Sequence, residues 1–156
     1  MEYNGKSDVQ QRIESVLFQK TEDYLLDDTL LSNPKVLIEG DEGVTIVPDF
    51  LSTEHGVVGE IYAHIGRIKP AQAHKIAADV LKMLLYEKTQ GRRLKKYIVV
   101  CDEQVEDYLK GQSYLSAAIS QFGVEVLYFP LEATDVVELK AAQDRQNFYN
   151  KTDKER

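Results

Sequence analysis

Apolar and polar residues alternate between Val36 and Ile65, and this alternation predicts β-strands. Strands over Val36 to Glu39 and Val44 to Asp49 flank Gly40 to Gly43, whose composition favours a hairpin turn. A third strand is predicted from Val57 to Ile65, with one apolar or small face and an opposite face that carries Glu60. We therefore expect a meander of strands with a core face and a polar face.

Helical spacing of apolar residues is found on both sides of this meander. A helix beginning at Ser7 or Asp8 is indicated by apolar positions at Val9, Ile13, Val16, Leu17 and Tyr24, and Asn33-Pro34 breaks it. After Pro70 a long helix is expected from Ala71 to about Gln90. The remainder predicts a strand over Tyr97 to Cys101, a helical stretch from about Glu103 to Phe122 that Gly111 interrupts, a strand over Val124 to Phe129 and a helix from about Thr134 to Asn147.

This order of elements, α-β-β-β-α-β-α-β-α, predicts an α/β fold with a mixed sheet flanked by helices. The strand, helix, strand units near the C-terminus imply right-handed crossovers and parallel pairing. The length of 156 residues suits one domain, which we place at 1–149, with a disordered tail at 150–156.

Composition narrows the class of protein. A hydrophobic content of 43% is typical of a globular protein, and no apolar run approaches the length of a membrane span. The polar start lacks the apolar region of a signal peptide, so we expect a cytoplasmic protein without a membrane partner. The net charge of −7 argues against non-specific coating of nucleic acid, although it allows local recognition.

Two carboxylates in the meander form the candidate site. If residues 51–56 make the hairpin loop, Phe50 pairs with Val57, and Asp49 and Glu60 become diagonal neighbours on one face, with backbones about 7–8 Å apart. Such a pair favours Mg²⁺ or Mn²⁺. On spacing alone, an ordinary role also stays open, with Asp49 as a turn former and Glu60 facing solvent.

The order of elements, with Pro48-Asp49 ending a strand and Glu60 in the next, resembles the PD-(D/E)XK nuclease superfamily, which has a restriction-endonuclease-like fold. The resemblance covers roughly residues 8–101. It implies that Asp49, Glu60 and the carbonyl of Ile61 bind a divalent cation. A carboxylate on the first helix often joins them, and Glu14 is the matching position.

The superfamily normally places a lysine two residues after the glutamate, where this chain has Tyr62. A neutral phenol cannot hold phosphate charge as an ammonium does. Since some members supply the lysine from a neighbouring element, Lys75 early on the following helix is the best substitute, and Lys69 and Lys82 are weaker ones. His64, on the Glu60 face, is a candidate base.

Two functions follow from these residues. The first is a metal-dependent endonuclease acting on DNA, as a homodimer or with a partner subunit. Its DNA-backbone contacts would come from Arg67, Lys69, Arg92 and Arg93. The second is a catalytically inactive module of the same fold that binds nucleic acid or a protein, which Tyr62 and the acidic charge favour.

Overall fold

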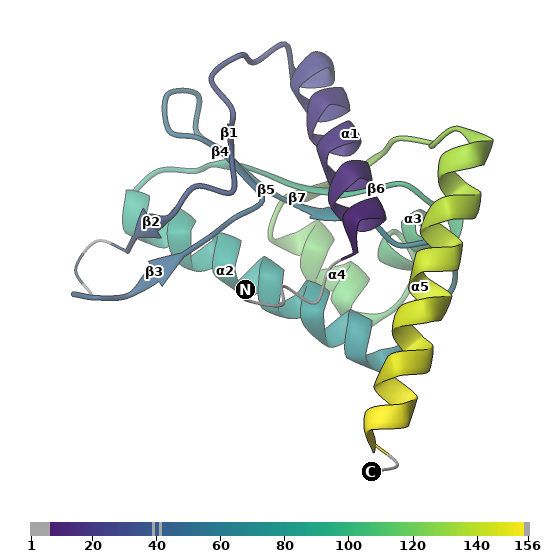
Figure 1. Cartoon of the computed structure of the whole chain (residues 1–156). Coiled ribbons are helices and arrows are strands. Elements are labelled where there is room, and N and C mark those ends of the chain that lie inside the picture. The colour runs from purple at the N-terminus through teal and green to yellow at the C-terminus, as the bar shows by residue number, and fades with distance from the viewer. Residues whose placement is uncertain (1–6, 39, 41, 155–156) are drawn as a thin grey trace.

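The structure, a computed structural model, describes residues 7–38, 40 and 42–154. Its helices and strands follow one another along the chain as shown in Figure 1. Their bounds are α1 Asp8–Leu25, β1 Leu31–Ser32, β2 Val36–Leu37, β3 Thr45–Ile46, β4 Phe50–Ser52, β5 Val57–Tyr62, α2 Pro70–Gln90, β6 Lys95–Val100, α3 Glu103–Leu109, α4 Tyr114–Gln121, β7 Val124–Tyr128 and α5 Ala133–Lys154.

A five-stranded mixed sheet of order β1-β4-β5-β6-β7 forms the centre of the fold. β1, β4 and β5 pair in antiparallel fashion, whereas β5, β6 and β7 are parallel, as the strand and helix alternation predicts. The α/β class with a mixed sheet flanked by helices is therefore confirmed.

Helices cover both faces of the sheet (Figure 1). On one face α1 and α5 enclose a core that includes Ile13, Leu17 and Leu139. On the other face α2, α3 and α4 pack over a second core that includes Val58, Ile76 and Ile98. Because side chains alternate along β5, Val58, Glu60 and Tyr62 share the face that α2 covers.

The first helix begins where its sequence predicts. Ser7 is its cap, since the side-chain oxygen accepts a hydrogen bond from Gln10 N at 3.1 Å. Ile13, Leu17 and Thr21, each four residues from the next, are buried against the sheet. The helix ends at Leu26, whose φ of 52° is left-handed. α1 thus presents its other sides to the surface and to the edge of the sheet.

The strand predicted from Val44 to Asp49 is divided in the structure. β3 pairs with β2 in a separate two-stranded sheet, with Val36 opposite Ile46. The chain then enters the main sheet as β4, so residues expected in a hairpin loop form a strand and the loop shrinks to residues 53–56. The short strand β1, which the sequence did not predict, pairs with the outer side of β4.

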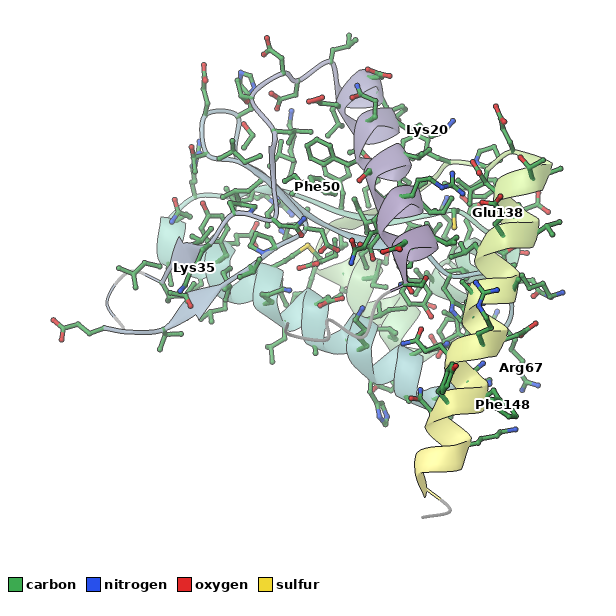
Figure 2. All side chains as sticks on the ribbon, viewed as in Figure 1. Lys20, Lys35, Phe50, Arg67, Glu138 and Phe148 are labelled. Carbon is green, nitrogen blue, oxygen red and sulfur yellow. The ribbon has the colours of Figure 1, made fainter. Side chains whose placement is uncertain are left out.

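The predicted pairing of Phe50 with Val57 is wrong by two residues, because Phe50 pairs with Gly59. The glycine is required by this register, since a Cβ at Gly59 would lie 2.0 Å from the Phe50 ring. Figure 2 shows Phe50 between α1 and the sheet, where its fully buried ring packs beside Ile13 and Leu17. A shift of two positions leaves every side chain on its predicted face.

The C-terminal half follows the predicted order with two adjustments. The stretch from Glu103 to Phe122 is interrupted around Gly111, as expected, and forms α3 and α4. α5 continues to Lys154, so the expectation of a disordered tail is wrong from Asn150 to that residue, and 155–156 lie outside the described residues. Among the described residues, no helix combines the length and the apolar character that a membrane span requires.

Candidate functional site

Asp49 lies where the antiparallel ladder between β4 and β5 stops. Continuing the register of Phe50 with Gly59 by one position places Asp49 opposite Glu60. Instead of extending the ladder with its backbone, Asp49 uses its side chain, and Oδ2 accepts a hydrogen bond from Ile61 N at 2.7 Å. Its backbone carbonyl accepts from Asn33 N at 3.0 Å. These contacts fix the Asp49 carboxylate beside the middle of β5.

Pro48 explains why the ladder stops there. The same register would place Pro48 opposite Ile61, but proline has no N–H to donate to the Ile61 carbonyl. The Asp49 carboxylate accepts the hydrogen bond of the Ile61 N–H. The Ile61 carbonyl receives no ladder hydrogen bond from this strand, because Pro48 has no N–H. The Pro-Asp pair thus places a carboxylate and a backbone carbonyl at the same break in the sheet.

Glu60 is buried, with 4% of its surface exposed, on the face of β5 that α2 covers. Burial, and then the neighbouring charges of Asp49 and Asp79, raise the pKa of Glu60 to about 9. Among the described residues its Oε1 finds no hydrogen-bond partner, although Lys82 Nζ lies 2.7 Å away, so this contact is an ion pair without hydrogen-bond geometry. A buried carboxylate oxygen without a hydrogen bond is unusual in native structures, and a bound ion is one explanation for it.

The ammonium at this site belongs to Lys82, not to Lys75. Lys82 Nζ also lies 3.5 Å from Asp79 Oδ1 and 3.4 Å from Val47 O. Burial disfavours the charge of Lys82, but its interactions with Glu60 and Asp79 outweigh burial and raise the pKa of Lys82. Lys75 is exposed two turns earlier on α2, and it acts on Asp79 only through its charge. Lys82, which the sequence analysis ranked below Lys75, is thus the lysine that contacts Glu60.

Tyr62 fills the position where the resemblance leads us to expect lysine. The side chain is buried under α2, and its hydroxyl has no hydrogen-bond partner in the part of the chain that the structure describes. Its ring contacts that of His64 with centroids 5.4 Å apart. His64 Nε2 lies 3.0 Å from Gln72 Nε2, and burial lowers the pKa of this imidazole. His64 therefore contacts Tyr62 and Gln72 beyond the end of β5.

Glu14 lies on α1 beside the same break in the sheet. Together with Asp49 and Ile61 it lines a cleft of about 690 Å³ between α1 and the sheet edge. The cleft therefore brings together three of the residues that the sequence singled out.

The basic residues proposed to contact DNA do not converge on this cleft. Arg67 and Lys69 follow the carboxyl end of β5, whereas Arg92 and Arg93 precede the amino end of β6. Because β5 and β6 are parallel and in register, the two pairs lie at opposite ends of the sheet. Arg92 donates to Thr53 O at 2.7 Å, and Figure 2 shows Arg67 beside the distal part of α5.

The donors at the break fit a hard divalent cation in part. Two carboxylates and a backbone carbonyl are ligands that Mg²⁺ accepts, with waters completing the shell. The Glu60 oxygen that lacks a hydrogen bond and the Ile61 carbonyl that Pro48 leaves without a ladder donor are the features that favour such an ion. Within the described part of the chain, no three Asp, Glu, His or Cys side chains come together closely enough to hold a metal. The protein would thus supply Asp49, Glu60 and the Ile61 carbonyl, with Glu14 beside them.

Sequence reasoning missed Asp79 and ranked Lys82 too low. Both belong to a polar row on α2, with Gln72 and Lys75, which resembles a solvated helix face. In the structure Asp79 and Lys82 are largely covered, with side-chain exposures of 21% and 24%. The signal available in the sequence was their position beside the core stripe that includes Val80 and Met83.

Comparisons of this chain with protein-family models, with curated proteins and with solved structures found no match.

Proposed function

We propose that this protein is a divalent-metal-dependent nuclease that hydrolyses phosphodiester bonds in DNA, with a site of the PD-(D/E)XK type. One observation carries the proposal: a buried glutamate, an aspartate and a backbone carbonyl meet at the Pro48 break, with an ammonium 2.7 Å from the glutamate. These are the parts that phosphodiester hydrolysis needs, and folding a buried cluster of like charges is otherwise costly.

Asp49, Glu60 and the Ile61 carbonyl would hold Mg²⁺ or Mn²⁺. Glu14 lines the cleft beside Asp49 but does not form a three-carboxylate cluster with the other two, so it would support the ion through a bound water. A cation bound there would polarise the phosphodiester and make an attacking water more acidic. Lys82 supplies the positive charge that Tyr62 cannot, and it would stabilise negative charge that develops on the phosphate. Asp79 positions Lys82 from the same side of α2, at 3.5 Å.

A second candidate is a catalytically inactive module that binds nucleic acid or a protein. The charge distribution favours it, because the chain carries a net charge of −7 and none of the described residues that line the cleft is basic. In this alternative Lys82 keeps its contact with Glu60 and no metal enters, and the cluster serves only the packing of α2 on β5. The two candidates differ in whether the carboxylates bind a metal.

The deciding experiment compares the wild type with Asp49→Asn and Glu60→Gln, which preserve shape while removing charge. Melting temperature is recorded with Mg²⁺, Mn²⁺ or a chelator, and single-stranded and duplex oligonucleotides are then incubated with each protein. The nuclease proposal predicts a metal-dependent rise in melting temperature and cleavage in the wild type, and loss of both in the two variants.

Asp28→Asn is the matched control, because Asp28 is exposed beyond the end of α1. It should behave as wild type. Melting curves without metal verify that all variants fold. A wild type that gains no stability from either metal, alone or with an oligonucleotide, and that cuts neither substrate, would contradict the nuclease proposal in favour of the inactive module.

Two-strand cleavage would also require two sites. One copy of the site cuts one strand, and symmetric pairing of two copies is the usual solution. We therefore propose a homodimer or a partner subunit for cleavage of duplex DNA, and sedimentation of the protein with and without DNA measures this directly.

A further inference from the structure

The cleft beside Asp49 has hydrogen-bonding walls, in which neutral polar side chains accompany the two acidic residues Glu14 and Asp49. Its volume of about 690 Å³ falls within the range of small-ligand sites, roughly 300–1,000 Å³. One wall is a single face of α1, because its residues follow the helical pattern i, i+3, i+4, i+7 and i+8. The opposite wall is the edge of the sheet. The α1 residues are Gln11, Glu14, Ser15, Phe18 and Gln19, and those of the sheet edge are Ser32, Asn33, Asp49 and Ile61.

The side-chain amide groups that line the cleft retain donors and acceptors that can form hydrogen bonds with a ligand. Gln19 Nε2 donates to Asp23 Oδ1 at 3.1 Å, and Asn33 Nδ2 donates to Ser32 Oγ at 3.2 Å. A primary amide has two N–H donors and a carbonyl acceptor, so these contacts leave donor and acceptor positions on both side chains. Gln11 adds a third amide, and half-buried Phe18 adds an aromatic ring.

The charges that line the cleft disfavour binding of a phosphate backbone along its walls. Glu14 and Asp49 are the ionisable side chains among its described lining residues, and both are acidic. Phosphates along these walls would be repelled, because backbone binding requires Lys or Arg. Neutral amides beside an aromatic ring are instead suited to a nucleobase, which offers donors and acceptors on its edge and a flat face for stacking.

On the basis of the proposed nuclease function, we propose that the cleft binds an unpaired base of single-stranded DNA next to the phosphodiester at Asp49. A base inside a duplex hides its Watson–Crick edge and both of its faces, and reaching them requires extrusion from the stack. Asp49 and Ile61 belong both to the candidate metal site and to the cleft, so a phosphodiester at Asp49 places an adjacent base against α1. The substrate class is therefore single-stranded DNA or a single-stranded flap.

Binding measured apart from cleavage tests this inference. Fluorescence anisotropy is recorded for a labelled single-stranded oligonucleotide and for a blunt duplex of the same sequence, with Ca²⁺ in place of Mg²⁺. The wild type should bind the single strand more tightly. Phe18→Leu, which keeps the apolar packing on the core but removes the aromatic face, should weaken single-strand binding roughly 5- to 150-fold, the range for loss of one stacked base.

A Gln11→Leu, Gln19→Leu double variant tests the hydrogen-bonding wall without touching the core and should also weaken single-strand binding. Phe148→Ala is the aromatic control, because Phe148 is 67% exposed on α5, away from the cleft, and binding should be unchanged. Equal affinity for the duplex and the single strand, or no effect of either cleft variant, would overturn the inference.

The two proposals fail separately. If the cleft variants weaken single-strand binding but no DNA is cut with Mg²⁺ or Mn²⁺, the cleft assignment holds and the nuclease proposal fails. If DNA is cut but the cleft variants bind single strands like the wild type, the nuclease proposal holds and the cleft assignment fails.

Discussion

Lys82 on α2 lies with its Nζ 2.7 Å from Oε1 of Glu60 on β5, so the helix brings an ammonium group to a buried carboxyl group of the sheet. The chain connects these two residues through the end of β5, the segment 63–69 and the first turns of α2. The functional importance of this ion pair is open to direct measurement.

Replacement of Lys82 by Met should reduce DNA cleavage about 100-fold or more, the typical cost of removing one group that stabilises transition-state charge. Metal-dependent stabilisation should persist, because Asp49 and Glu60 remain. Lys75→Met is the matched control on the same helix and should leave the cleavage rate unchanged. Steady-state cleavage and melting curves with Mn²⁺ measure the two effects. A Lys75 variant that loses activity while the Lys82 variant keeps it would reverse the assignment.

Stability of the metal-free protein should fall as pH rises. The pKa of Glu60 is raised from 4.5 to about 9, so between these values the folded state holds a proton that the unfolded state releases. The unfolding free energy then decreases with pH over this window, by at most about 1.4 kcal/mol per pH unit. Asp49, Asp79 and Lys82 are the charged groups that face Glu60. Urea unfolding at several pH values should show this fall in the wild type and a flatter profile in Glu60→Gln. Parallel profiles would show that Glu60 does not retain the proton.

The Asp27 carboxylate at the end of α1 should have the opposite dependence. Burial alone would raise its pKa, but hydrogen bonds from Thr29 and His55 outweigh burial, and the pKa of Asp27 is lowered from 3.8. Oδ1 of Asp27 lies 2.9 Å from both Thr29 N and His55 Nδ1. The stabilisation is present above the ordinary carboxyl pKa and is lost as pH falls through the lowered one.

Asp27→Asn should therefore destabilise the protein at neutral pH by about 1–3 kcal/mol, and the difference from wild type should vanish in acid. The exposed neighbour Asp28→Asn serves as the control. Acid unfolding followed by circular dichroism measures both. If the deficit of the Asp27→Asn variant stays constant at every pH, then shape, not ionisation, is what Asp27 contributes.

Lys96 is buried at the start of β6, with 2% of its surface exposed, and its ammonium pairs with Glu87 of α2. Glu87 also accepts a hydrogen bond from Leu94 N at 2.9 Å. Glu87→Ala should cost about 3–5 kcal/mol, because it leaves a buried charge without a partner. Adding Lys96→Met to that variant should recover much of the loss. Urea denaturation gives both values, and no recovery in the double variant would show that the Leu94 contact dominates.

The faces of the strands were predictable from the sequence, whereas the exact register was not. Alternation along β5 placed Asp49 and Glu60 together, and this result survived because the error in register was an even number of residues. The division of β3 from β4 depends on contacts with residues distant in the sequence, such as the hydrogen bond from Asn33 N to Asp49 O. Local patterning carries no information about such contacts.

The sequence could not identify Lys82 as the lysine that contacts Glu60, and the reason is geometric. From Pro70 to Lys82 an α-helix rises about 18 Å, at about 1.5 Å per residue. Selecting Lys75 assumed that the first turns of α2 lie nearest to Glu60, but the lysine that contacts Glu60 is Lys82, two turns farther along the helix. Connector length and path come from tertiary packing, as in the anchoring of Ile65 N and Ile65 O by Gln143.

At Pro48 the residue that would best stabilise the sheet differs from the residue that the proposed metal site requires. A residue with an N–H at that position would extend the ladder and would be favoured by any selection for stability alone. The extended ladder would occupy the Ile61 carbonyl and remove the break at which Asp49 stands. The sheet is therefore left incomplete at the place where its completion would close the proposed metal site, so the nuclease proposal implies that stabilising substitutions at Pro48 reduce cleavage.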